Sequence, residues 1–435
     1  MSKTCADILH FSVFLFIIES MRKIYPNGGI AAVSYMEGAF MADCWNKNYP
    51  FALPFILDGA TGTELTRRGM PEGGCTEQFI LEHPQILTDL QNEYRKAGSD
   101  AVLAPTFGAN RPTLERHGFS PEDADELCTR LYRIAKDAAG DSKVGGDMSP
   151  TGLLLKPYGD ADPETVYEIY TEQAKTLLAC GVDFIWIETM ISAAEARLAV
   201  RAVRDLSADI PVYVSLTVNE NGRTMNGDAP EAALLTMVPY HIQGFGCNCS
   251  IGPDVILNAL RPAAPIAKLY GIPLIAKPNA GMPVTDENGT HFPLTPSDMA
   301  AYAERLTGIG VGIFGGCCGT TPAHIETIAK AAKSTAKERF SDVETAEDGV
   351  YVSTARVFAL TDPDAVYTPV DADGEDDLYE LMDECDAEDI LYLELGEGAG
   401  ELLVRMDAFI PNPIAVRGDE KEIAVIEKNL CRKVR

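Results

Sequence analysis

Histidine is scarce in this chain of 435 residues, and the short sequences that mark several common enzyme classes are missing. The 6 histidines include no pair spaced four residues apart, which argues against a metal site built from histidine. No Gly-x-Gly-x-x-Gly sequence follows a strand-like run, and neither a Walker nor a Gly-x-Ser-x-Gly sequence occurs. The sequence therefore lacks the marks of a dinucleotide-binding fold, a P-loop nucleotidase and a serine hydrolase.

Basic residues are also few, with 36 Lys and Arg against 65 Asp and Glu and a formal net charge of -29. This excess argues against nucleic acid and against an anionic membrane surface as partners. The acidity is concentrated in residues 341–400, which hold 19 acidic residues and one basic residue, Arg356. We expect residues 341–435 to form an acidic α/β appendage without an assigned role, with strands at 350–360 and 390–395 and helices at 376–386 and 420–430.

Long apolar runs are absent as well. The most apolar segment, residues 8–18, has eleven residues, whereas a membrane-spanning helix needs about twenty. A signal peptide is disfavoured because no small-x-small cleavage site follows closely and the cysteines look unpaired. We therefore expect no membrane association, a cytoplasmic protein, and an N-terminal extension (residues 1–50) outside the fold, with Met41 as an alternative start.

The 11 cysteines are odd in number and irregularly spaced, in a chain too long to need disulfides, which fits a reducing compartment. Cys317 and Cys318 lie together between glycines, an arrangement that core packing does not explain. A third thiol comes from Cys247 or Cys249, and chemistry alone leaves the choice between these two open. Three thiolates around zinc leave a fourth position free, which is typical of a catalytic site and allows an incoming thiol to bind.

From residue 51, short apolar runs alternate with longer helical stretches, such as 84–97, 121–139, 163–180 and 193–206. This pattern predicts βα units and a parallel sheet. Eight units in under 300 residues predict an α/β fold of the (β/α)8 barrel type over residues 51–340; an open doubly wound sheet is the alternative. The expected strands are 54–60, 100–107, 143–148, 184–190, 211–217, 244–249, 273–279 and 312–318.

Polar residues gather at the carboxyl ends of these strands, where barrel enzymes carry their active sites. A carboxylate after the apolar run 184–187 is difficult to explain by packing alone. All of the following positions are expected on one rim of the barrel: Asp58, Thr106, Asp147, Glu188, Cys249, Asn279, Cys317 and Cys318.

Six segments resemble the homocysteine S-methyltransferase family: ILDGATGTEL (56–65), PTFGAN (105–110), GDMSPTG (146–152), IETM (187–190), NCSIGP (248–253) and GGCCGT (315–320). The likeness runs in order from about residue 51 to about 335. It implies one zinc ion per chain, with Cys249 rather than Cys247 as ligand beside Cys317 and Cys318. It further implies that Asp58 and Glu188 bind the homocysteine ammonium, that backbone donors around Gly59 and Thr106 bind its carboxylate, and that Asn279 faces the metal when substrate is absent.

The resemblance implies an enzyme of methionine biosynthesis in which zinc activates homocysteine as a thiolate for methylation, so that no protein nucleophile is needed. The methyl donor is not identified by the sequence. No cobalamin-binding Asp-x-His-x-x-Gly sequence is present, so a methylated corrinoid would have to come from a partner protein. The alternatives are a small methyl donor, a subunit that receives methyl from such a partner, and a zinc or thiol sensor without catalysis.

Overall fold

The structure is a computed structural model, and it describes residues 51–156, 158–287, 289–347, 351–353, 358–362, 364–386, 389–406, 410 and 412–430. The expected N-terminal extension, with its alternative start at Met41, lies outside the described residues. Within them, no helix is both long enough and apolar enough to cross a membrane.

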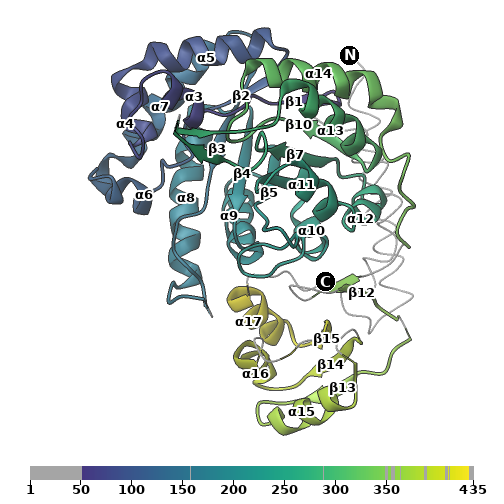
Figure 1. Ribbon diagram of the computed structural model, residues 1–435. Helices are drawn as coiled ribbons and strands as arrows, with labels where there is room; N and C mark the ends of the chain where they lie inside the picture. The colour runs from purple at the N-terminus through teal and green to yellow at the C-terminus, as the bar shows by residue number, and fades with distance from the viewer. Residues whose placement is uncertain are drawn as a thin grey trace, which may run out of the picture.

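An eight-stranded parallel sheet curls into a barrel with helices around it (Figure 1). The strand order is β1-β10-β7-β6-β5-β4-β3-β2, and the predicted (β/α)8 barrel is confirmed. The strands are β1 (Phe55–Ile56), β2 (Ala101–Leu103), β3 (Lys143–Met148), β4 (Phe184–Met190), β5 (Val212–Leu216), β6 (Gly244–Cys249), β7 (Leu274–Pro278) and β10 (Val311–Phe314).

Proline marks the start of half of the helices around the barrel, because its fixed φ is preorganised for the first helical position. The helices that begin with proline are α5, α8, α10, α11, α13 and α14. The helices of the barrel are α3 (Gly62–Arg67), α4 (Thr76–Glu82), α5 (Pro84–Lys96), α6 (Arg111–Arg116), α7 (Ala124–Ala139), α8 (Pro163–Cys180), α9 (Ala193–Leu206), α10 (Pro230–Met237), α11 (Pro253–Leu260), α12 (Ala264–Leu269), α13 (Pro296–Gly308) and α14 (Pro322–Thr335).

The expected strand bounds were too generous at three places that matter for the site. β1 ends at Ile56, β2 ends at Leu103 and β10 ends at Phe314, so Asp58, Thr106, Cys317 and Cys318 lie in loops that follow strands. Glycines at 315 and 316 follow β10, and they stop the strand because they lack side chains to pack in a ladder. The predicted helix at 121–139 is also divided, with a 3-10 turn at Pro121–Asp123 before α7.

The seam between β1 and β2 is closed partly by carboxylates. The amide of Asp100 donates to the carbonyl of Ile56 at 2.7 Å, and the amide of Ile56 donates to Oδ2 of Asp100 at 2.9 Å. Further along, the amide of Leu103 donates to Oδ2 of Asp58 at 2.9 Å. Side chains therefore supply acceptors where these two short strands lack a regular ladder.

The interior of the barrel has an aromatic floor and a polar upper part. Phe55, Phe184, Trp186 and Tyr213 belong to one buried cluster inside the sheet. A larger cluster fills the space between the sheet and the helices. Because side chains alternate along a strand, residues two positions beyond the inner apolar ones also face inward, toward the carboxyl ends of the strands.

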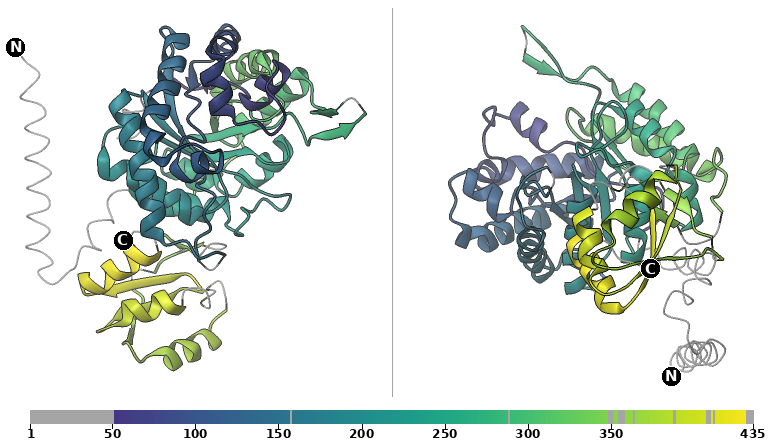
Figure 2. Two further views of the ribbon diagram at one scale, coloured as in Figure 1. Left: turned by 90° about the vertical axis from the view of Figure 1, so that its left-hand side faces the viewer. Right: turned by 90° about the horizontal axis from the view of Figure 1, so that it is seen from below.

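A short antiparallel hairpin, β8 (Val284–Asp286) and β9 (Gly289–His291), interrupts the unit between β7 and α13. The sequence analysis did not predict it. Figure 2 shows the hairpin projecting from the barrel, to the right in the left-hand view, while the C-terminal appendage lies below the barrel in that view.

The appendage is a small α/β unit, as expected. β13 (Thr368–Val370), β14 (Leu391–Leu395) and β15 (Ile414–Gly418) form a parallel sheet with α15 (Glu375–Asp383), α16 (Ala399–Met406) and α17 (Glu420–Leu430). The strand expected at 350–360 is instead an antiparallel pair, β11 (Tyr351–Ser353) and β12 (Phe358–Leu360). β13, α16 and β15 were missed. The unit has its own buried cluster, which includes Leu378 and Leu393.

The first residues after α14 still belong to the barrel surface. The amide of Phe340 donates to the carbonyl of Thr307, and a side chain on Gly310 would meet the Phe340 ring at 2.0 Å. Lys268 Nζ donates to the carbonyl of Val343 at 2.6 Å. The division of the chain into a barrel and an appendage is therefore best tested with a barrel that ends near residue 347.

We expect residues 51–347 to fold without the appendage, whereas a chain ending at Lys337 should lose on the order of 3 kcal/mol of unfolding free energy because it lacks Phe340. Urea denaturation of the two truncated proteins measures this difference. Equal stability would contradict the role of Phe340, and failure of both proteins to fold would contradict the domain division.

Candidate active site

The structure brings three of the predicted thiols to one point of the rim. The Sγ atoms of Cys249, Cys317 and Cys318 all lie within 4.8 Å of one another. Cys249 ends β6, and the other two lie in the loop after β10; β7 lies between these strands in the sheet. Residues about seventy positions apart in sequence therefore form one cluster because parallel strands end on the same rim.

The backbone around Cys249 is turned into the left-handed region, with φ of 57° at Cys249 and 61° at Ser250. Non-glycine residues adopt this conformation at a cost of about 1–3 kcal/mol when the surrounding structure enforces it. The Ser250 hydroxyl accepts from the amide of Val218 at 2.9 Å, and the amide of Asn279 donates to the carbonyl of Cys249 at 3.3 Å. These contacts hold the turn.

The loop with Cys317 and Cys318 is fixed on both sides by backbone hydrogen bonds. The amide of Cys317 donates to the carbonyl of Pro278 at 2.8 Å, and the amide of Ala280 donates to the carbonyl of Cys318 at 3.0 Å. Gly319 has a φ of 80°, and a side chain there would meet Phe292 at 2.1 Å. Glycine is therefore required directly after the cysteine pair.

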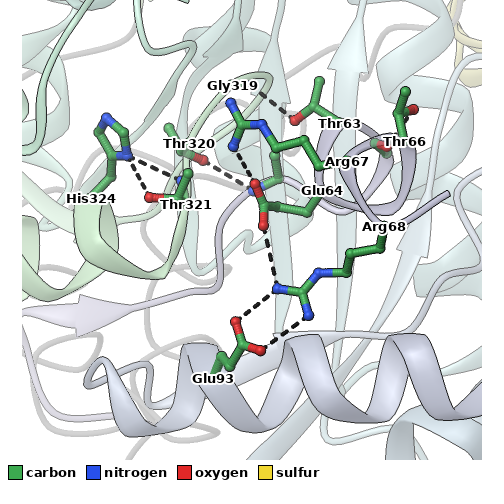
Figure 3. A network of polar contacts seen from close by, with 12 residues as sticks. Thr63, Glu64, Thr66, Arg67, Arg68, Glu93, Gly319, Thr320, Thr321 and His324 are labelled. Atoms are coloured by element: carbon green, nitrogen blue, oxygen red, sulfur yellow. Dashed lines mark hydrogen bonds and ion pairs between the residues drawn. The ribbon is translucent and has the colours of Figure 1, made fainter. Parts of the chain in front are cut away.

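Figure 3 shows how the same loop is tied to α3. The amide of Gly319 donates to the hydroxyl of Thr63 at 3.1 Å, and the amide of Ala60 donates to the hydroxyl of Thr320 at 3.0 Å. His324 caps α14, since the amide of Thr321 donates to its Nδ1 at 3.1 Å. This histidine therefore has a structural role.

Cys247 faces away from the cluster. It is fully buried in the core between sheet and helices, and burial raises the pKa of its thiol. Two residues later, the side chain of Cys249 leaves the strand at the turn and reaches the other thiols. The geometry therefore brings together the set with Cys249 and leaves Cys247 as a core residue.

The three thiols hydrogen-bond to one another. Donation from Cys317 and Cys318 lowers the pKa of Cys249 to about 3, and the bond to Cys249 raises the pKa of Cys317 to about 11. The same contact raises the pKa of Cys318. Three thiolates at this spacing repel one another, so full ionisation of the cluster requires a cation.

Below the thiols lies a buried ion pair that the sequence analysis missed. Lys277 Nζ donates to Oε2 of Glu188 at 2.6 Å, and the indole Nε1 of Trp186 donates to the same oxygen at 2.7 Å. Burial alone would lower the pKa of Lys277, but Glu188 and Asp58 outweigh it and the pKa is raised. A signal was available, because Lys277 interrupts an otherwise apolar strand, as Glu188 does.

Two further carboxyl groups share this polar layer. Burial raises the pKa of Asp58 to about 7, against the opposing effect of Lys277. Burial, and then the charge of Glu188, raise the pKa of Asp147 well above its usual value. Among the described residues, Oδ1 of Asp147 is buried without a hydrogen-bond partner. A bound cation would favour the ionised form of both groups.

The remaining predicted residues, Thr106, Gly59 and Asn279, follow the ends of their strands and differ in how far their polar groups are already hydrogen-bonded. The hydroxyl of Thr106 donates to the carbonyl of Asp147 at 2.8 Å and accepts from its amide at 3.0 Å. Gly59 has no room for a side chain, because a Cβ would meet the Tyr94 ring and hydroxyl at 2.7 Å. Asn279 Nδ2 donates to the carbonyl of Ser250 at 2.6 Å, while its Oδ1 is buried without a partner in the described part of the chain.

The chain resembles known methyltransferases in sequence and in fold. The family model described as homocysteine S-methyltransferase matches residues 55–332. The methionine synthases of Mycobacterium tuberculosis and Mycobacterium leprae are each 34% identical over 63% of this chain, which spans only 24% of their length. The metallated form of the homocysteine methyltransferase MmuM from Escherichia coli shares the fold, with a TM-score of 0.54 and 21% identity over 63% of this chain and 95% of that chain. Since the family model covers well over half of the sequence, the chain belongs to the homocysteine S-methyltransferase family.

Proposed function

We propose that this protein is a zinc-dependent enzyme that transfers a methyl group to the thiol of homocysteine and forms methionine. The observation that carries the proposal is the cluster of Cys249, Cys317 and Cys318 on the rim, directly above a buried acidic layer. A small molecule that carries both a thiol and an ammonium group matches these two features, with its thiol at the cysteines and its ammonium at the carboxyl groups.

The residues present fit a zinc ion. Zinc–sulfur bonds of about 2.3 Å in a tetrahedral site place sulfurs about 3.8 Å apart, which is compatible with three Sγ atoms within 4.8 Å of one another. The unpartnered Oδ1 of Asn279 supplies an oxygen beside them. When bound, zinc supplies a Lewis acid that lowers the pKa of a fourth, incoming thiol. The chain itself then needs only to hold and orient the substrate.

In this proposal Asp58 and Glu188 bind the substrate ammonium, and backbone donors near Gly59 and Thr106 bind its carboxylate. Asp58 and Glu188 are both nearly fully buried, so a charge-assisted hydrogen bond to them is poorly screened by solvent. Fixing the two charged ends of the substrate orients its sulfur and lowers the entropic cost of reaching the methyl donor. The methyl carbon gains its bond to sulfur as the donor leaves with the electron pair of the broken bond.

The rim also favours a large methyl donor, such as a methylated corrinoid protein. Five exposed apolar side chains lie in the segments that follow β2, β3, β5 and β7, the last of them in β8: Phe107, Tyr158, Met225, Met282 and Val284. Apolar side chains gathered around a site are typical of a surface that another protein covers. Trp186, in contrast, is fully buried among the inner core residues and is not available to a methyl donor at the rim.

We also infer a reducing compartment, such as the cytoplasm. All eight cysteines in the described residues are free thiols, and three of them form the proposed metal site. An oxidising compartment would convert such a cluster to disulfides.

The first test concerns the metal. Purified under reducing conditions, the protein should contain one zinc per chain, because three thiolates and one open position satisfy a tetrahedral ion. Cys317→Ala should remove zinc, since two thiolates hold it poorly. Cys247→Ala is the matched control and should retain zinc. Elemental analysis measures the content, and loss of zinc in the Cys247 variant with retention in Cys249→Ala would refute the ligand set.

The second test concerns thiol activation. X-ray absorption at the zinc edge should show three sulfur neighbours in the free protein and four after homocysteine is added. Methionine serves as the control, because its methylated sulfur has no proton to release and binds zinc weakly. A sulfur count that does not change with homocysteine would refute direct activation and leave the zinc or thiol sensor as the better interpretation.

A further inference from the structure

The polar layer beneath the thiols has more negative than positive groups. It contains three carboxyl groups, those of Asp58, Asp147 and Glu188, and one ammonium, that of Lys277. Buried charges are retained at low cost only when they are paired. Among the described residues this layer therefore has one cation for three carboxyl groups, and a bound cation would allow more of them to ionise.

The three carboxyl groups are not equally free to receive one. Oε2 of Glu188 already accepts from Lys277 and from Trp186, at 2.6 and 2.7 Å. Oδ2 of Asp58 accepts from the amide of Leu103 at 2.9 Å and helps to close the barrel seam. Asp147 is 5% exposed, and within the described residues its Oδ1 has no hydrogen-bond partner.

Asp147 also lies in a suitable place. It is on β3, where its Cα pairs with that of Trp186 on the neighbouring β4. Parallel neighbours in register point to the same face, so Asp147 faces inward, as Trp186 does. The charges of Glu188, Lys277, Asp58 and Cys317 all act on it, so Asp147 lies near both the ion pair and the thiols.

We propose that Asp147 receives the ammonium group of the amino-acid thiol, and that Lys277 is a positioning residue that holds Glu188 beside it. The inference rests on the proposed function and adds a substrate contact that belongs to this chain's own polar layer. Lys277 donates to Oε2 of Glu188, and the unpartnered Oδ1 of Asp147 adds a further acceptor for the ammonium beside Asp58 and Glu188. Selectivity for a cationic substrate then depends on the balance between Asp147 and Lys277.

The test compares two ligands on the zinc-loaded full chain by calorimetry. One is L-homocysteine, and the other is 4-sulfanylbutanoate, which keeps the thiol and the carboxylate but lacks the amino group. Asp147→Asn should weaken homocysteine binding about 10- to 100-fold, as expected for a lost hydrogen bond to a charged group. Binding of 4-sulfanylbutanoate should be unchanged, so the selectivity ratio, defined as the dissociation constant of 4-sulfanylbutanoate divided by that of homocysteine, falls.

Lys277→Met should raise the selectivity ratio, because the ammonium of homocysteine then becomes the only cation among the carboxyl groups of the layer. Glu195→Gln is the matched control. Glu195 is a buried carboxylate outside the site that accepts from Thr151 and Tyr170, and its variant should keep the wild-type ratio.

An unchanged ratio in Asp147→Asn, or equal loss of both ligands, would overturn the inference while leaving the proposed function intact. A wild-type protein that binds neither thiol would overturn both. If Asp147→Asn does not fold, Lys277→Met decides: a higher ratio supports the assignment, and an unchanged ratio overturns it.

Discussion

Barrel closure is the constraint on which the site depends, because it places residues from distant strands on one rim. At the seam, the short β1 and β2 meet through the carboxylates of Asp100 and Asp58, which accept the amides of Ile56 and Leu103. Asp58 is therefore both a closing contact and a member of the acidic layer. The position of the thiols above that layer follows from the parallel order of β6, β7 and β10.

Within the barrel, the chemistry changes sharply along the axis. Aromatic rings fill the lower part of the interior. Two residues further along the strands, charged side chains face inward. The transition passes through Trp186, whose ring packs among Phe184 and Tyr213 while its Nε1 donates to Glu188. Lys277 Nζ lies 5.8 Å from the centre of the same ring. A single side chain thus joins the apolar core to the polar floor of the site and fixes the orientation of Glu188.

Much of this arrangement could be predicted from local patterns. Alternating apolar runs and proline-started helices indicated the barrel, and Cys317-Cys318 between glycines indicated a thiol cluster. Lys277 was missed although it interrupts an apolar strand as Glu188 does; only the folded sheet shows that the two residues form an ion pair. The separation of Cys247 from Cys249 depends on a left-handed turn at Cys249, which no periodicity reveals. The β8–β9 hairpin and the βα pattern at 368–418 are short, and short elements give weak periodic signals.

Gly315 has a consequence for how this site can vary. A side chain at that position would lie 2.7 Å from Cγ of Lys277 and 3.1 Å from the backbone of Asp58. The lysine stem therefore occupies space that only glycine leaves open. A lineage could not acquire alanine at 315 while keeping lysine at 277, so the two positions are epistatic. The shorter residue at 277 would have to come first, and the acidic layer would meanwhile be without its internal counter-ion.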